Sequence, residues 1–472
     1  MTCKKTFEEC EMDILKLSMS EAEKYQEIEI TDEIKDMLYI LEDHLRSPDY
    51  ICYGGTAINN ILPKKDQFYN YDKEIPDYDV FCKNALDHVK EIADKFHRKG
   101  YQNILAKSGV HVGTYKLYVN KFQLLDITQL DPIIYDHIYK ECIKVSGIHY
   151  APPNFLRQSM YLELSSPAGE IKRWEKVLKR LNLLNKHYPL KLPKECSPKK
   201  NFIEENQIYK LVKKELIDQG VVFIGAYADF LYSKFMPKDK QEKLKHITDF
   251  DVLSNDPYKT INILKKTLEM EDIKQVKVIK HPGVGELIKD HYELKVENVS
   301  LCFIYEPFAC HSYNEIKMND DTIKIGTIDT LLTFYLMFIY IGRPYYDLNR
   351  ILCISHLLFN LQQHHRLSQT GILKRFSVSC YGKQHNLNDI FDHKSEIYEK
   401  LKNKKNSREY ETYFLKYSPD NKNKYNLNDD IKDNFIESSK DDFKKSKSKR
   451  KNSRKLKKSN KSRKNLRYFS FL

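Results

Sequence analysis

The sequence predicts an α/β (α+β) protein that contains two tandem copies of one unit, the second of them degenerate. A short apolar strand, a glycine turn and an apolar helix occur in "YICYGGTAINNIL" and again in "VVFIGAYADFLY". Each copy continues into a strand with two aspartates one residue apart, "PDYDVF" and "TDFDVL". The turn precedes the second aspartate by 24 residues in the first copy, Gly55 to Asp79, and by 25 in the second, Ala226 to Asp251. Repetition of these elements in the same order and with similar gaps indicates an internal duplication.

The chain divides into six predicted segments around this duplication. Apolar residues at helical spacing precede the first copy, and a proline-rich stretch, "PLKLPKECSPKK", separates the two copies. The predicted segments are a helical N-terminal part (1–46), the first copy (47–190), a linker (191–202), the degenerate second copy (203–365), a helical C-terminal extension (366–439) and a basic tail (440–472).

The basic tail holds the excess charge of the molecule. The formal net charge is +13, from 79 Lys or Arg and 66 Asp or Glu, and residues 440–467 contain 15 basic and 2 acidic residues, which leaves 64 of each sign elsewhere. A segment so charged and so poor in apolar residues is predicted to be disordered. We expect it to contact a polyanion such as RNA without sequence preference. A nuclear-import signal and a solubilising tail are the alternatives.

Composition and hydropathy argue against several other classes of protein. The ten cysteines form neither a CxxC pair nor a Cys/His cluster at zinc spacing. The N-terminus does not resemble a signal peptide. The most apolar run, "TLLTFYLMFIYIG", is shorter than the roughly 18 residues that a membrane span requires, so it is predicted to be a buried core helix. We therefore expect a soluble intracellular protein with reduced thiols and no membrane contact.

The glycine turn of the first copy is a candidate anion site. Gly54 and Gly55 end a short strand and open a helix, where the backbone can approach a ligand closely and the helix offers unpaired amides. Thr56 adds a hydroxyl. A Gly-Gly pair alone is more often only a turn, so this signal depends on what lies near it.

Three aspartates near this turn are candidate metal ligands. Asp77 and Asp79 share one face of a strand because side chains alternate with a period of two. Asp126 lies in the apolar strand "FQLLDI", where an unpaired carboxylate is costly to bury, so we place it on the neighbouring strand. Two Mg²⁺ ions held by this cluster would activate an attacking hydroxyl and steady a triphosphate. Asp126 is expected to hold the activating metal and is a candidate general base. Each aspartate alone is more simply a turn residue, a cap or a surface charge.

The second copy lacks parts of this predicted site. It keeps the aspartate pair, but Phe303 stands at the position that corresponds to Asp126, and Tyr227 replaces Thr56. Two carboxylates without the third should bind metal poorly. We therefore predict a folded but catalytically silent copy that has a structural role or forms a wall for RNA.

An amphipathic helix closes the first copy, "GEIKRWEKVLKRLNLLNKHYP". The basic residues of its polar face are Lys172, Arg173, Lys176, Lys179 and Arg180. Some of them are expected to contact a triphosphate or an RNA backbone; a solvated helix face is the alternative.

The turn, the aspartate strand and the third aspartate together resemble the polymerase-β-type nucleotidyltransferases. The longer pattern is "YGGTAINNIL…PDYDVF…HVGTYKLYV…LLDITQL…RWEKVLKRLNLLNKHYP", followed by the degenerate copy. It resembles the poly(A) polymerase catalytic subunits of large nucleocytoplasmic DNA viruses, of the mimivirus and African swine fever virus type. This resemblance covers about residues 45–365 and implies two tandem nucleotidyltransferase-like domains.

The resemblance implies template-independent transfer of AMP from ATP to the 3′ end of an mRNA, with release of pyrophosphate and with Mg²⁺ or Mn²⁺ as the cofactor. Under it, the metal-binding and catalytic residues are Asp77, Asp79 and Asp126. The nucleotide-binding residues under it are Gly54, Gly55, Thr56, Arg173 and Lys176.

The same resemblance implies partners and a location. The partners are ATP and an RNA 3′ end. Mimivirus-like enzymes resemble self-sufficient homodimers, whereas poxvirus relatives work with a separate processivity partner, so a homodimer is one expectation. The host cytoplasm, with packaging in the virion, is the expected location.

Two other functions compete with this hypothesis. One is a nucleotidyltransferase of different specificity, such as a uridylyl transferase or an enzyme that nucleotidylates a protein. The other is a non-catalytic RNA-binding subunit. The intact Asp77, Asp79 and Asp126 argue against the second, because a silent protein should show losses such as the one at Phe303.

Overall fold

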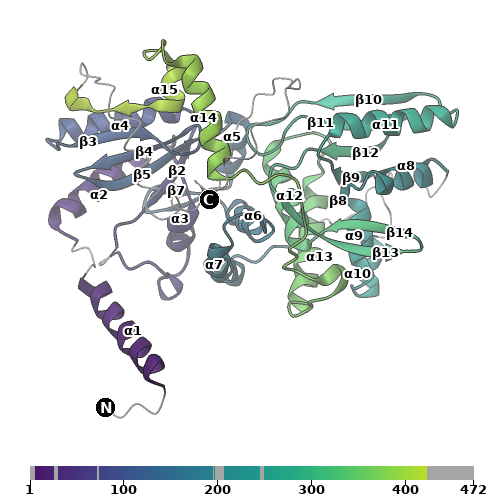
Figure 1. Cartoon of the computed structure of the whole chain (residues 1–472), viewed down its shortest axis with the longest axis horizontal. Helices are drawn as coiled ribbons and strands as arrows, with labels where there is room; N and C mark the ends of the chain where they lie inside the picture. The colour runs from purple at the N-terminus through teal and green to yellow at the C-terminus, as the bar shows by residue number, and fades with distance from the viewer. Residues whose placement is uncertain are drawn as a thin grey trace.

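The computed structural model describes residues 6–25, 30–71, 74–194, 196, 207–244 and 249–421. The predicted basic tail and most of the predicted linker lie outside the described residues. The described chain forms two eight-stranded mixed sheets that lie side by side, the first in its N-terminal half and the second in its C-terminal half (Figure 1).

The strands of the first sheet are, in spatial order, β16 (Lys416–Tyr417), β3 (Ile104–Ser108), β4 (Thr114–Val119), β5 (Phe122–Gln129), β2 (Tyr78–Cys82), β1 (Ile51–Tyr53), β7 (Ile148–Tyr150) and β6 (Ile143–Val145). Those of the second are β10 (Val276–His281), β11 (His291–Val296), β12 (Val299–Tyr305), β9 (Phe250–Leu253), β8 (Val222–Phe223), β14 (Asp321–Gly326), β13 (His311–Met318) and β15 (Cys380–Tyr381).

The two sheets repeat one topology. From β3 to β6, successive neighbours pair antiparallel, antiparallel, parallel, antiparallel, parallel and antiparallel. From β10 to β13 the same six pairings occur in the same order. The two tandem units that the repeated motifs predict are therefore present as two copies of one sheet.

Helices cover both sheets and fill the space between them. In the first half they are α1 (Phe7–Tyr25), α2 (Asp32–Leu45), α3 (Gly54–Ile61), α4 (Ala85–Arg98), α5 (Pro132–Lys140), α6 (Pro153–Leu164) and α7 (Trp174–His187). In the second half and the C-terminal extension they are α8 (Gln207–Asp218), α9 (Ala226–Ser233), α10 (Lys238–Leu244), α11 (Pro257–Met270), α12 (Ile328–Ile341), α13 (Leu348–His364), α14 (Leu387–Leu401) and α15 (Arg408–Phe414).

The most apolar stretch of the sequence forms α12, and every residue of this helix is buried. The Thr327 side chain accepts a hydrogen bond from the amide of Thr330 and caps its start. The helix ends at Gly342, whose φ of 68° lies in the left-handed region that glycine adopts readily. The prediction of a buried core helix is confirmed. No helix among the described residues is both long enough and apolar enough to cross a membrane.

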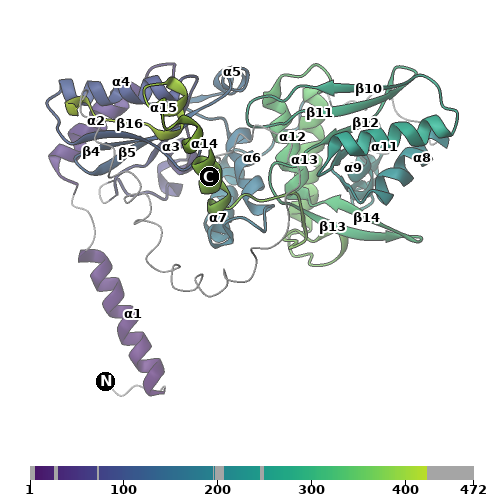
Figure 2. The ribbon, with the colours of Figure 1, turned by 45° about the horizontal axis from the view of Figure 1, so that its top comes forward.

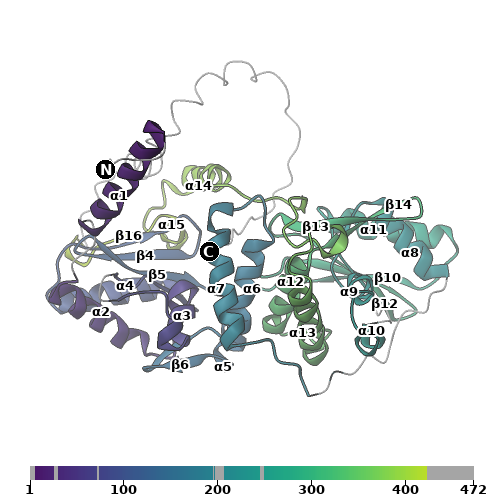
Figure 3. The same ribbon diagram turned by 90° about the horizontal axis from the view of Figure 1, so that it is seen from below.

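Corresponding helices join the two halves. Helix α6 follows the parallel strand β7 in the first half, and α12 follows β14 in the second. These two helices lie next to each other at the centre of the molecule, with α7 and α13 on their outer sides (Figure 3). Phe155 of α6 meets Tyr340 of α12 edge to face, with ring centroids 5.4 Å apart. The amide of Ser312 also donates to the carbonyl of Ser165 across the junction, at 2.7 Å.

The C-terminal extension crosses from the second half back to the first. Strand β15 pairs with β13, and β16 pairs with β3, which places α14 and α15 over the first half (Figure 2). Arg408 forms an ion pair with Asp87 at 2.9 Å, and Lys90 forms one with Glu411 at 2.8 Å. The predicted helical extension therefore also contributes an edge strand to each sheet.

Two disulfides have both of their cysteines within the described ranges, which differs from the expectation of reduced thiols. Cys310 at the start of β13 is bonded to Cys380 in β15, with a Cα–Cα distance of 5.2 Å. Cys196 is bonded to Cys353 of α13, with a Cα–Cα distance of 5.6 Å. The partners lie 70 and 157 residues apart in sequence and meet only through tertiary packing, so spacing alone gave no sign of them.

One helix boundary also differs from the sequence-based expectation. The amphipathic helix expected from Gly169 starts at Trp174, after a short 3₁₀ turn at Ile171–Arg173. The shift falls at a helix end, where local sequence signals are weakest.

Candidate active site

The strand register brings two of the candidate carboxylates together. Asp79 on β2 pairs with Tyr53 of β1 on one side and with Asp126 of β5 on the other. Asp77 directly precedes β2 and is exposed. Because residues 77 and 79 lie two apart at the start of a strand, their side chains emerge toward the same side of the sheet.

The environment of Asp79 disfavours a bare negative charge. Burial and the neighbouring charges of Asp77 and Asp126 raise the pKa of Asp79 well above its usual range. The charges of Lys116 and Arg173 oppose this shift to a smaller extent. Because Asp79 lies among other carboxylates, a bound cation would stabilise its ionised form.

Asp126 already has a cation partner within the chain. Lys116 on β4 stands beside it in the register, and its Nζ lies 2.7 Å from Asp126 Oδ2. Gln123 donates to the other carboxylate oxygen at 2.9 Å. Burial raises the pKa of Asp126, and the Lys116 ammonium lowers it. Lys116 was not singled out from the sequence, although its alternation across a hairpin from Asp126 was a usable signal.

The glycine turn fits closely over the carboxylates. Gly54 has a φ of +70°, and a Cβ there would lie 2.6 Å from Asp79 Oδ2. A Cβ on Gly55 would lie 2.5 Å from Tyr69 Oη and 2.8 Å from Arg180 Nη1. Both positions therefore exclude larger side chains, and no side chain caps the first amides of α3. These amides meet the description of an anion site at a helix start.

Thr56 has a structural partner in this arrangement. Its side chain is 2% exposed and its hydroxyl donates to the carbonyl of Asp77 at 2.6 Å. The hydroxyl thus fixes the chain just ahead of β2, close to where a phosphate group is expected.

Tyr69 and Arg180 form a cover over the turn; the sequence indicated Arg180 as a candidate phosphate contact, but gave no sign of Tyr69 or of the contact between them. Arg180 Nη2 donates to Tyr69 Oη at 2.6 Å, and its guanidinium lies 4.7 Å from the ring centroid of Phe68. The buried Asn59 side chain accepts from the amides of Phe68 and Tyr69 at 2.7 and 2.9 Å and so fixes this loop. The loop has no periodic sequence pattern, because the hydrogen bonds that fix its backbone at Phe68 and Tyr69 come from the distant side chain of Asn59.

Helix α7 turns part of its basic face toward the site. Arg173 lies 3.1 Å from the buried Glu163 and lowers the pKa of Asp79 by its charge. Burial first, and then the charges of Arg180 and Arg173, lower the pKa of Lys176. By contrast, Lys179 is exposed and pairs with Glu175 at 2.6 Å. The polar face is therefore divided between the site and solvent.

Glu163 on α6 is a further buried acid beside this cluster. It is 3% exposed, and burial raises its pKa to about 7. Arg173 and, to a smaller extent, Arg180 and Lys176 oppose the rise. Glu163 lies on α6, one of the helices that join the two halves, and pairs with Arg173, which directly precedes α7.

The three aspartates are suitable ligands for a hard divalent cation, but their side chains are not arranged around one point. Asp77, Asp79 and Asp126 offer carboxylate oxygens, which Mg²⁺ prefers. Within the part of the chain that the structure describes, no three acidic, histidine or cysteine side chains surround one point. Asp126 is turned to Lys116, so a metal would have to replace that ammonium on the carboxylate.

The second copy repeats the backbone of the site without its third carboxylate. Asp251 on β9 pairs in register with Phe303 on β12, as Asp79 pairs with Asp126. The hydroxyl of Tyr305 donates to Asp251 at 3.3 Å.

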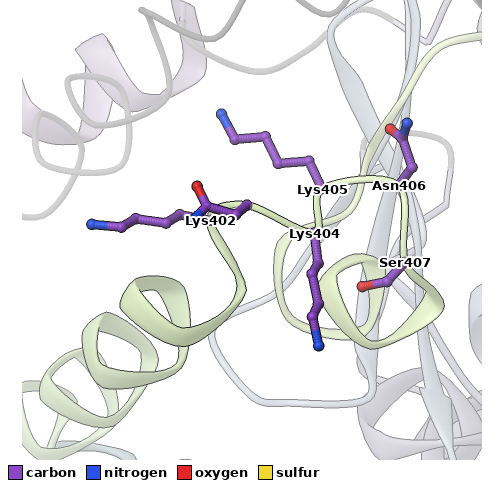
Figure 4. Close-up of a pocket in the computed structure, with 6 residues that line it drawn as sticks. Lys402, Lys404, Lys405, Asn406 and Ser407 are labelled. Atoms are coloured by element: carbon purple, nitrogen blue, oxygen red, sulfur yellow. The ribbon is translucent and has the colours of Figure 1, made fainter.

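A separate hollow of about 310 Å³ lies in the turn between α14 and α15. It is lined by residues 402–407, three of them lysines, but the side chains of Lys402, Lys404 and Lys405 point in different directions (Figure 4). Since their ammonium groups do not converge, this turn offers no single site for an anion comparable to the cluster around Asp79.

Sequence comparison shows what the first half resembles. Residues 39–170 match the family model described as the poly(A) polymerase catalytic subunit. This range runs from α2 to just beyond α6 and contains the Gly54–Gly55 turn and the three aspartates.

Individual relatives are viral proteins named as candidate poly(A) polymerase catalytic subunits. A protein of an African swine fever virus isolate from Malawi is 26% identical over 164 residues, which cover 34% of each chain. The protein of the Badajoz strain is 24% identical over 295 residues, which cover 61% of this chain and 58% of the relative. An Acanthamoeba polyphaga mimivirus protein is 29% identical over 195 residues, which cover 38% of this chain and 32% of the relative. The matched regions thus span between about a third and three fifths of these relatives.

The fold is similar to that of a solved structure over nearly the whole chain. The crystal structure of the Megavirus polyadenylate synthase superposes with a TM-score of 0.73 at 16% identity, and covers 89% of this chain and 88% of that one. The resemblance that the motifs indicate is therefore confirmed: residues 39–170 match the model of the poly(A) polymerase catalytic subunit family, and the fold of the chain is similar to that of a viral polyadenylate synthase.

Proposed function

We propose that this protein is a polynucleotide adenylyltransferase, which extends RNA 3′ ends with AMP taken from ATP. The observation that carries this proposal is the register of Asp79 beside Asp126, directly under the Gly54–Gly55 turn. The family match over residues 39–170 and the names of the viral relatives support the choice of reaction.

The reaction is an in-line exchange at the α-phosphate. The RNA 3′ oxygen loses its proton and forms a bond to the α-phosphorus of ATP, while the bond from that phosphorus to the bridging oxygen breaks and pyrophosphate leaves. No covalent link to the protein is needed, so the chain contributes position and charge.

The carboxylates Asp77, Asp79 and Asp126 would hold the divalent metal. Mg²⁺ or Mn²⁺ bound there would supply positive charge to lower the pKa of the 3′ hydroxyl and to stabilise the triphosphate. Asp126 orients the hydroxyl side of the site and is the candidate acceptor of its proton, while Lys116 balances its charge until substrate binds.

The triphosphate is assigned to the opposite side of the turn. The amides at the start of α3 and the cations Arg180, Arg173 and Lys176 face the same region. Tyr69 holds the Arg180 guanidinium at a fixed angle, so the bound phosphates meet a preformed donor.

Primer extension tests this function and one residue assignment together. The purified chain would receive a short labelled RNA, Mg²⁺ and one nucleoside triphosphate at a time. We expect a ladder with ATP alone, and its loss by at least about a hundredfold in Asp126→Asn, with RNA binding retained.

Other outcomes separate the competing functions. A ladder with UTP instead of ATP would keep the fold and the site and change the substrate to uridylate. RNA binding without extension by any nucleotide would favour a non-catalytic subunit. Full activity in Asp126→Asn would overturn the assignment of the site.

A further inference from the structure

A small cavity in the second copy corresponds in position to the candidate active site of the first. It lies at Asp251 and Phe303, the register pair that matches Asp79 and Asp126. Its volume is about 70 Å³, and residues of the helices α9, α12 and α13 line it together with strands β9 and β12. The lining residues used below are Asp229, Asp251, Phe303, Tyr345, Tyr346 and Arg350.

Asp229 presents a hydrogen-bond acceptor that the chain does not use. Its side chain is 1% exposed, and Oδ2 accepts from the hydroxyl of Tyr335 at 2.6 Å. Oδ1 has no hydrogen-bond partner among the described residues. Buried acceptors are nearly always satisfied, so a ligand that donates into the cavity would complete this group.

Arg350 presents a cation on the same cavity. Its charge acts on Asp229, yet no ion pair or side-chain hydrogen bond joins its guanidinium to another residue in the described ranges. A half-buried guanidinium has five donors in a planar fork that suits a phosphate group. The presence of this cation argues against a metal ion as the occupant, and the described residues form no metal-binding trio there.

Aromatic rings form the remaining wall. Phe303 and Tyr345 stack with centroids 5.4 Å apart and an interplanar angle of 23°. Phe338 and Tyr346 stack at 4.3 Å and 13°. Each ring covers one face of its partner, so a flat nucleobase would contact the outer faces and edges of these pairs while polar groups contact its own edge.

We propose that this cavity is a second, non-catalytic nucleotide site, which receives the amino edge of an adenine base at Asp229 and its phosphate at Arg350. Carboxylates accept from the exocyclic amine of adenine or cytosine, whereas uracil offers a carbonyl at the same edge. The volume admits a few water molecules, or the edge of one base, with sugar and phosphate at the mouth.

The choice of adenine over cytosine rests on the proposed function, which supplies adenine nucleotides in two forms. One is free ATP or AMP, and the other is the adenylate at the 3′ end of the RNA. Both present the same amine and phosphate, so competition with each form decides the source.

Photocrosslinking to the full-length chain gives a readout that does not depend on activity. The probe is 8-azidoadenosine 5′-monophosphate, and the labelled peptides are mapped by mass spectrometry. We expect label on the peptide that contains Tyr345 and Tyr346. AMP and CMP should compete with the probe and remove this label, and UMP should compete about tenfold less well. A short oligoadenylate that competes better than AMP identifies the RNA end as the source, and the reverse order identifies the free nucleotide.

Substitutions test the two polar groups. Arg350→Met is expected to weaken labelling of this peptide about tenfold, whereas Arg366→Met, in the exposed turn after α13, leaves it unchanged. Asp229→Asn keeps an acceptor for Tyr335 but can present an amide donor to the cavity, and should abolish the preference for AMP over UMP. If Arg350→Met lowers the melting temperature, its loss of labelling is not informative, and the preference for AMP over UMP in Asp229→Asn decides the test.

Label confined to peptides of the first copy, or equal competition by AMP and UMP, would overturn the proposal. Parallel primer extension keeps the two hypotheses separate. If the chain extends RNA with ATP but Tyr345 and Tyr346 are not labelled, the second site is refuted and the proposed function is supported. If the second site is labelled but no extension occurs, the proposed function is refuted and the second site is supported.

Discussion

At the scale of single residues, Asp126 cannot satisfy two partners at once. One carboxylate oxygen is 2.7 Å from the Lys116 ammonium, and the other accepts from Gln123. A bound metal needs the same oxygens. Lys116 therefore lowers the free-energy cost of burying the Asp126 carboxylate when no metal is bound. A metal that binds Asp126 must displace the Lys116 ammonium.

Arg180→Met should weaken ATP binding about tenfold, because it removes the cation next to the Gly54–Gly55 turn. Tyr69→Phe should have a smaller effect in the same direction, since it only releases the guanidinium. Lys179→Met is the matched control, one residue away on α7 but paired with Glu175 in solvent. Equilibrium binding of ATP and KM from primer extension measure the effect. Equal losses in Arg180→Met and Lys179→Met would contradict the assignment.

Gly54→Ala should both destabilise the protein and abolish transfer. The positive φ costs roughly 1–2 kcal/mol for an alanine, and its Cβ would meet Asp79 at 2.6 Å. Gly100→Ala separates these effects, because Gly100 also has a positive φ, +92°, but has open space around it. Melting temperature should fall in both variants, and primer extension only in the first. Normal extension in a folded Gly54→Ala would show that the close approach to Asp79 is dispensable.

At the scale of elements, the C-terminal extension is held to the first sheet by β16 and by few buried contacts. Leu415 is 3% exposed, and its carbonyl accepts from the amide of Ser108 at 2.9 Å. The ion pair of Arg408 with Asp87 is largely exposed and contributes little, and that of Lys90 with Glu411 is only partly buried.

Leu415→Asp should therefore detach this segment without unfolding the sheets. Limited proteolysis should cut within residues 382–421 much faster than in the parent chain, while the main thermal transition shifts by a few degrees. Asn406→Asp, in the exposed turn before α15, should leave the cleavage pattern unchanged. Cooperative loss of the whole fold in Leu415→Asp would mean that the extension is part of the first core.

How far the sequence predicts each element depends on how its contacts are made. The duplicated strands and Asp126 could be located because alternation with a period of two and a repeated spacing are local signals. The Tyr69–Arg180 contact spans 111 residues and depends on the Asn59 side chain, and β16 pairs with a strand some 300 residues earlier. Contacts of this kind leave no periodic trace, so only the folded chain reveals them.

At the scale of the whole molecule, net charge is divided between a neutral body and the predicted basic tail, which lies outside the described residues. Removal of residues 440–472 should weaken RNA binding and flatten its dependence on salt, because fewer phosphate counterions are released. Extension of a saturating primer should continue. Binding titrations of both chains at several salt concentrations measure the slopes. An unchanged slope would exclude the tail from RNA contact.

The junction of α6 with α12 places like against like, since each helix follows the same strand of its own unit. Self-complementary contacts of this type are what a symmetric pair of separate subunits would use. The two units of this chain thus meet through equivalent helices, as the two subunits of a symmetric dimer would. Phe303 removes a carboxylate from the second unit, whereas the wholly buried α12 keeps that unit attached to the first.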